Sequence, residues 1–66
     1  MELKPYQQRV VDEKKELDQK RDKLNVFLLG ETFASLDIAE KSRMAHQAKI
    51  MLDYSDILAE RIAAFT

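Results

Sequence analysis

A short segment between two charged stretches holds the residue types best suited to binding a small ligand. Gly30 permits close approach of a ligand to the backbone, and Thr32 and Ser35 supply hydroxyl donors. Phe33 offers an aromatic face for stacking. The free amides at the start of a following helix favour anions. Together these features predict a site for a small anionic ligand.

Three further side chains with suitable chemistry follow this segment, namely Lys41, Arg43 and His46. Lys41 and Arg43 suit a phosphate, because charge-assisted hydrogen bonds to phosphate oxygens are short and strong. We expect His46 either at a partly buried interface or stacked on the ligand. Three such turns around a symmetry axis would surround a symmetric cyclic phosphodiester. A second interpretation stays open, in which the hydroxyls only cap helix ends, the phenyl ring closes the end of the fold and the basic side chains offset nearby acids.

The same inventory argues against catalysis and metal binding. A catalytic site needs a nucleophile, a base and an oxyanion stabiliser that converge in a cleft, and the single histidine has no such partners at useful spacing. The chain has no cysteine, so it lacks a disulfide and a thiolate zinc site. We therefore expect no enzymatic activity, no cofactor and no metal site.

The charge pattern limits the partners of the chain. Its net charge of −1 comes from 11 basic and 12 acidic residues, which are spread along the sequence rather than gathered in blocks. Such a balance argues against general DNA binding and against a polybasic membrane anchor. The longest apolar run, residues 26–29, is far too short to span a bilayer, and the N-terminus lacks the apolar core of a signal peptide. We expect a cytoplasmic protein.

Two apolar heptad series set the expected fold, and they are mirror images about residue 34. The series are Leu3, Val10, Leu17 and Leu24, then Met44, Met51, Leu58 and Phe65. Two helices of equal length that fold back on each other would place these partners level. The pattern predicts one all-α domain over residues 1–66, an antiparallel two-helix hairpin with helices at about 5–29 and 38–65 and a turn at about 30–37. The same mirror rule places Glu13 opposite Ser55.

Local signals indicate where the two helices begin and end. Pro5 suits a first helical position, where its missing N–H costs nothing. Gly30 suits the left-handed residue that often follows a helix. Asp37 with Glu40 three residues later has the spacing of a capping box and predicts the start of the second helix.

Opposite charges at helical spacing recur along the first helix. Examples are Glu16 with Lys20 and Asp18 with Arg21. Each such pair contributes about 0.3 kcal/mol to an exposed helix. This pattern is typical of a solvated face.

The second helix carries more apolar surface than one partner helix can cover. A hairpin of 66 residues has a single seam, so burial within one chain gives only marginal stability. We expect the remaining surface to meet other copies of the chain, with Ile50, Tyr54 and Ile57 at the interface. The predicted assembly is a symmetric helical homo-oligomer, a trimer or a higher multiple such as a hexamer.

Single residues spread over nearly the whole chain carry a resemblance to a known family. They are Pro5 to Lys14, Glu16-Leu17-Asp18, Lys23-Leu24, Phe27, Phe33 to Leu36, Gln47, Met51, Tyr54, Leu58 and Arg61-Ile62. In these positions the chain resembles the helical-hairpin domain shared by phage anti-CBASS and anti-Thoeris sponge proteins.

The resemblance implies a phage or prophage protein that acts in the infected bacterial cell. It would bind cyclic oligonucleotide or related immune signals without cleaving them, in symmetric oligomers, often hexamers, with pockets between chains. The sequence starts directly at the hairpin, without the extra N-terminal segment of the anti-CBASS sponges or the additional domain of the anti-Thoeris ones. This departure puts pockets for cyclic dinucleotides and ADP-ribose-derived signals in doubt and favours pockets built from hairpins alone, as for cyclic trinucleotides.

Two functions therefore remain in competition. The first is an oligomeric sponge for a cyclic oligonucleotide, above all a trinucleotide. Its ligand residues would be Thr32, Phe33, Ser35, Lys41, Arg43 and His46. The second is an oligomeric hairpin adaptor that docks on a host or phage protein and binds no small ligand.

Overall fold

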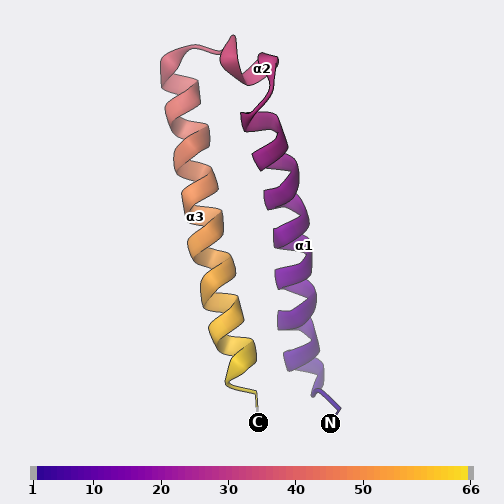
Figure 1. The fold of residues 1–66 in the computed structure, drawn as a ribbon. Helices are drawn as coiled ribbons and strands as arrows, with labels where there is room; N and C mark the ends of the chain where they lie inside the picture. The colour runs from indigo at the N-terminus through magenta and orange to yellow at the C-terminus, as the bar shows by residue number, and fades with distance from the viewer. Residues whose placement is uncertain (1, 66) are drawn as a thin grey trace.

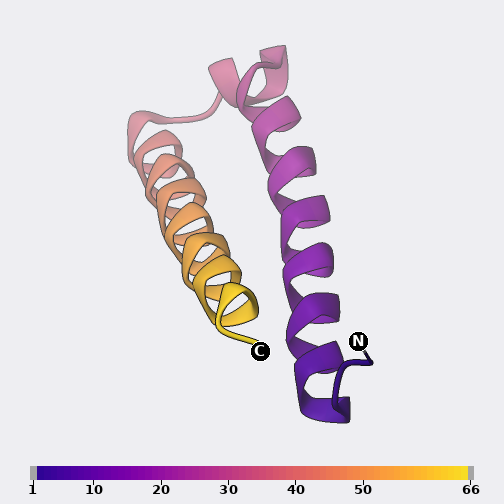
Figure 2. The same ribbon diagram turned by 60° about the horizontal axis from the view of Figure 1, so that its bottom comes forward.

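The protein folds as a long helical hairpin. The computed structural model describes residues 2–65, which form α1 (Pro5–Leu28), α2 (Glu31–Ala34) and α3 (Ile38–Ala63). The long helices α1 and α3 pack side by side and antiparallel, with α2 between them at one end and both termini at the other (Figure 1). Figure 2 shows the same arrangement from a second direction. Residues 2–65 contain no strand, so the predicted all-α hairpin is confirmed.

The starts of both long helices agree with the signals in the sequence. Pro5 is the first residue of α1, and the side-chain oxygen of Gln7 accepts a hydrogen bond of 2.8 Å from the backbone N–H of Lys4. At the start of α3, the carboxylate of Asp37 accepts a hydrogen bond of 2.8 Å from the backbone N–H of Glu40. Each bond satisfies an N–H that has no partner within its helix, which stabilises the helix end.

The prediction for Gly30 was wrong. Its φ is −92° and ψ is 169°, so its backbone is extended rather than left-handed. The reason is that a second helix begins at once, and the extended Gly30 is the residue that precedes α2. The N–H of Gly30 donates to the carbonyl of Phe27 over 3.0 Å and closes the last turn of α1. The predicted turn is therefore largely a short helix.

The apolar core runs from the middle of the hairpin toward the end that contains the termini. Val10, Leu17 and Leu58 are buried there, and Leu58 is fully enclosed. Three partly buried residues pack against them, namely Met51, Ile62 and Phe65. All of these residues except Ile62 belong to the two predicted heptad series. Removing this surface from water is the main favourable contribution to the packing of α1 on α3.

The register of the two helices differs from the mirror rule. Ser55 donates a hydrogen bond of 2.6 Å to Asp18, so it faces Asp18 rather than the predicted Glu13. At the open end, the rings of Tyr6 and Phe65 meet edge to face with centroids 6.4 Å apart. Figure 1 shows the cause of this shift in register. The short helix α2 lies beyond the end of α1, and α3 begins at about the height of α2. The apolar heptad series determine which residues face the other long helix, whereas the position of α2 determines the register of α3 along α1.

Candidate functional site

Two aromatic rings and one cation meet where α2 joins the long helices. The rings of Phe27 from α1 and Phe33 from α2 lie edge to face, with centroids 6.3 Å apart. The Nζ of Lys41, from the first turn of α3, lies 6.0 Å from the centroid of Phe33. We call these three residues the turn cluster. They offer an aromatic surface for a base and an ammonium group for a phosphate within one small region.

The two predicted hydroxyl residues lie in the same region. The hydroxyl of Ser35 donates a hydrogen bond of 2.8 Å to the carbonyl of Thr32. Ser35 therefore closes the C-terminal end of α2, as the capping interpretation predicts. The side chains of Thr32 and Ser35 are exposed, so their oxygen atoms remain accessible beside Phe33. The phenyl ring is half-buried and also closes the turn end of the hairpin.

Arg43 and His46 lie elsewhere on the surface. The Nε of Arg43 donates to a carboxylate oxygen of Glu40 over 2.8 Å, and its side chain is 67% exposed. Arg43 follows Lys41 by two residues, which is about 200° around a helix. His46 is exposed and comes three residues after Arg43, so these two share a side. A single chain therefore does not bring all six predicted ligand residues together.

The three predicted interface residues form an exposed strip on α3. Ile50, Tyr54 and Ile57 are 53%, 42% and 50% exposed. Their spacing of four and three residues places them on one face of the helix. The same spacing continues the strip through His46 and Arg43 toward the turn. We call Ile50, Tyr54 and Ile57 the α3 strip.

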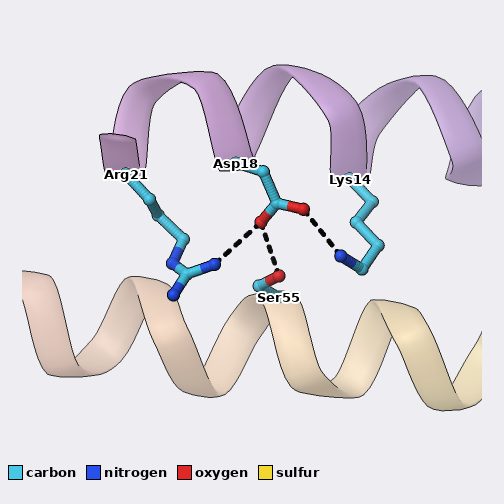
Figure 3. A network of polar contacts seen from close by, with 4 residues as sticks. All are labelled: Lys14, Asp18, Arg21 and Ser55. Atoms are coloured by element: carbon cyan, nitrogen blue, oxygen red, sulfur yellow. Dashed lines mark hydrogen bonds and ion pairs between the residues drawn. The ribbon is translucent and has the colours of Figure 1, made fainter. Parts of the chain in front are cut away.

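A polar network that the sequence did not reveal joins α1 to α3 (Figure 3). The carboxylate of Asp18 accepts hydrogen bonds from Lys14 at 2.6 Å, from Arg21 at 3.0 Å and from Ser55 at 2.6 Å. These bonds, first that from Lys14 and then those from Ser55 and Arg21, hold the pKa of Asp18 far below its ordinary value of 3.8. Opposite charges and donors stabilise the carboxylate form.

The network is structural rather than a ligand site. Its acceptor oxygens are already occupied by donors of the same chain, and Ser55 is only 3% exposed. It links the helices at one height and so opposes sliding of α3 along α1. The spacing of Asp18 and Arg21 was visible in the sequence, and a serine in the apolar stripe of α3 was the other signal. Their meeting depends on the register, which the sequence did not supply.

The remaining surface offers little chemistry. A hollow lies along the outside of α1, where a single helix lines it with Asp12, Lys15, Glu16 and Gln19. Residues 2–65 hold no group of three side chains placed to bind a metal ion. Over the same range, no helix combines the length and apolar character that crossing a membrane requires.

The described residues form a small helical hairpin with aromatic and basic side chains near its turn. Comparison with known families matches residues 4–64 to Sequestin, and the chain belongs to the Sequestin family. This family corresponds to phage cyclic-nucleotide sponge proteins, so the match confirms the resemblance seen in the sequence. Its name indicates sequestration rather than catalysis. No curated protein and no solved structure matches the chain.

Proposed function

We propose that this protein is an oligomeric sponge that binds and sequesters a cyclic oligonucleotide immune signal, above all a cyclic trinucleotide, without cleaving it. The observation that carries the proposal is the family match, which covers residues 4–64. As a phage counter-defence protein it would work in the cytoplasm of the infected bacterial cell and deprive the host effectors of their activating signal.

The chemistry of the turn cluster supports a nucleotide ligand. Each unit of a cyclic trinucleotide carries one base and one phosphodiester. Phe33 supplies an aromatic surface, and Lys41 lies 6.0 Å from its centroid with a positive charge. The hydroxyls of Thr32 and Ser35 add short polar contacts beside the ring. Three chains around a symmetry axis would repeat this set once for each nucleotide unit, which would match the symmetry of the ligand.

The division of the basic residues supports a site between chains. Lys41 and Arg43 lie about 200° apart around α3, so they do not reach one phosphate from a single chain. In an oligomer, Arg43 and His46 of one copy can face the turn cluster of another. The proposed ligand site is therefore incomplete in the monomer.

A thermal-shift comparison tests this function. A ligand that binds only the folded assembly raises its melting temperature by mass action. We expect cyclic tri-AMP to raise the melting temperature in a concentration-dependent manner, with linear tri-AMP as the matched control. A ligand at about 1,000 times its dissociation constant stabilises the folded protein by roughly 4 kcal/mol. The proposal is contradicted if neither cyclic trinucleotides nor cyclic dinucleotides change the melting temperature.

The alternative function is a hairpin adaptor for a host or phage protein, and the α3 strip favours it. Ile50, Tyr54 and Ile57 are about half exposed, as expected of a surface that a protein partner covers. An adaptor would show no thermal shift with any cyclic nucleotide. It would also stay monomeric or dimeric over a wide concentration range until its partner is added.

A further inference from the structure

The side chain of Glu40 does not cap the helix as its spacing from Asp37 predicted. Asp37 precedes α3, and its carboxylate accepts a hydrogen bond of 2.8 Å from the backbone N–H of Glu40. In a complete capping box the side chain of Glu40 would in turn accept a bond from the backbone N–H of Asp37. Within residues 2–65 only the first of these two bonds is formed. The carboxylate of Glu40 instead accepts a bond of 2.8 Å from the Nε of Arg43.

Arg43 is held differently from Arg21, the other arginine that pairs with a carboxylate in the described part of the chain. Arg21 donates through its terminal Nη1 to Asp18 over 3.0 Å, and its side chain is 24% exposed. Arg43 donates through Nε, and its side chain is 67% exposed. The hydrogen bonds and ion pairs within residues 2–65 engage neither Nη1 nor Nη2 of Arg43. Arg21 is thus used within the fold, whereas the terminal nitrogens of Arg43 are available to a ligand.

The two terminal nitrogens of Arg43 suit a phosphodiester. Nη1 and Nη2 form a rigid planar fork, and such a fork can bind two oxygens of one phosphate at once. A phosphodiester carries two non-bridging oxygens on its phosphorus. A long arginine side chain must otherwise be immobilised when a ligand arrives, and this loss of freedom lowers the affinity. A carboxylate that already holds Nε supplies part of this order before binding.

We infer that Glu40 is a positioning residue, which holds the Nε of Arg43 so that Nη1 and Nη2 can meet the two non-bridging oxygens of one phosphodiester. This inference rests on the proposed function, in which Arg43 contacts phosphate. The negative charge of Glu40 repels a phosphate, but its side chain is 43% exposed and water screens that repulsion. The order that Glu40 gives to Arg43 is not screened, so its net effect on the affinity is favourable.

Calorimetry with cyclic tri-AMP tests this role through two variants of Glu40. Glu40→Ala removes the acceptor for Nε, and we expect about threefold weaker binding. Glu40→Gln keeps an acceptor oxygen at the same reach and should retain most of the affinity. The matched control is Asp53→Ala, which removes the carboxylate of the Lys49 pair elsewhere on α3 and should leave the affinity unchanged. Circular dichroism of each variant confirms that the helices are intact.

A double-mutant cycle separates positioning from a general effect on the fold. In the Arg43→Ala background, Glu40→Ala should cause no further loss of affinity, because no guanidinium group remains to be held. The same loss in both backgrounds would overturn the inference. Tighter binding by both Glu40 variants would overturn it as well, since the carboxylate would then act on the phosphate chiefly by repulsion.

A measurement without ligand keeps this inference separate from the proposed function. The Nε–H proton of Arg43 is assigned in NMR spectra by its absence from Arg43→Ala. In Glu40→Ala it should exchange with water about twofold faster than in the unmodified protein, as expected for the loss of an exposed ion pair. Equal exchange rates in these two proteins would overturn the positioning. If the unmodified protein binds no cyclic nucleotide, the proposed function fails, while the exchange rates still decide whether Glu40 holds Arg43.

Discussion

The half of the hairpin that holds the termini and the half that holds the turn are built differently. The buried residues of the described part of the chain, Val10, Leu17, Ser55 and Leu58, lie between the middle of the hairpin and the termini. At the turn end, Val26, Leu29 and Ile38 are 72%, 89% and 85% exposed. Most residues with ligand chemistry belong to this second half. The comparison indicates that the buried residues which stabilise the fold are separate from the proposed ligand residues.

This separation has a physical advantage for a small protein. A hairpin of 66 residues has little stability to lose, and polar or exposed apolar residues at a binding site contribute little to it. The stabilising contacts are concentrated around Leu58 and the Asp18 network, between the middle of the hairpin and the termini. The turn half can then present aromatic and basic groups without weakening the core. Substitutions of the buried residues should therefore lower the free energy of unfolding. Substitutions in the turn half should instead lower the affinity for the ligand.

The largest effect should follow Leu58→Ala, because Leu58 is fully buried. Loss of its side chain leaves a cavity and should lower the free energy of unfolding by about 2–5 kcal/mol. Urea unfolding followed by circular dichroism measures the change. Leu29→Ala, at an 89% exposed position of the turn half, is the matched control and should change it by less than about 0.5 kcal/mol. Similar losses in both variants would remove the distinction between the halves.

The next effect concerns binding. Arg43→Ala removes an exposed guanidinium group from α3 and should weaken the binding of cyclic tri-AMP by about 1.5–3 kcal/mol while the oligomer stays intact. Calorimetry and sedimentation measure the two quantities. Lys49→Ala, which removes a similarly exposed ion-paired cation nearer the middle of α3, is the control with unchanged affinity. Unchanged affinity of Arg43→Ala would exclude Arg43 from the site.

A smaller effect should follow Asp18→Asn, which keeps the shape of the side chain but removes its charge. We expect a loss of about 1 kcal/mol at pH 7, since the network is partly solvent-accessible. The pKa of Asp18 is lower in the folded protein than its ordinary value of 3.8. The carboxylate therefore adds to the free energy of unfolding above about pH 4, and this contribution is lost as the pH falls below 3.8. Urea midpoints at pH 7 and pH 3 should therefore differ more for the unmodified protein than for Asp18→Asn. Equal differences would contradict this role for Asp18.

The smallest effect should follow Lys41→Met, which keeps an unbranched side chain beside Phe33 without the ammonium group. The lost cation–π contact is worth about 0.5–1 kcal/mol at an exposed position, so stability should change only slightly. If Lys41 also contacts phosphate, the affinity for cyclic tri-AMP should fall by more than the stability does. Equal small changes in both would assign Lys41 to the fold alone.

Much of the fold could be predicted from the sequence, because hydrophobic period and helix-end residues are local signals. Pro5, Asp37 and the apolar stripes gave the helices and the buried positions. The register could not be obtained in the same way, since it depends on how α2 lies against the end of α1. For that reason Glu13 was expected where Asp18 is found, and the network with Ser55 was missed. Gly30 shows that a glycine after a helix can begin the next one instead of ending the first.

The candidate site was predictable only as a set of residue types. Phe33, Lys41 and Arg43 were chosen for their chemistry, and helical geometry then placed the last two on opposite sides of α3. The contact of Phe27 with the ring of Phe33 depends on the fold of the turn. A site formed between chains leaves no complete pattern in one chain. Its geometry therefore depends on the assembly.

The central claim, that the protein captures a cyclic oligonucleotide and does not cleave it, is tested most directly by calorimetry with cyclic tri-AMP followed by recovery of the ligand. The protein is titrated, denatured, and the released nucleotide is separated by chromatography. The account predicts saturable binding and quantitative return of the intact cyclic molecule. Absence of saturable heat, or recovery of a linear product, would contradict it.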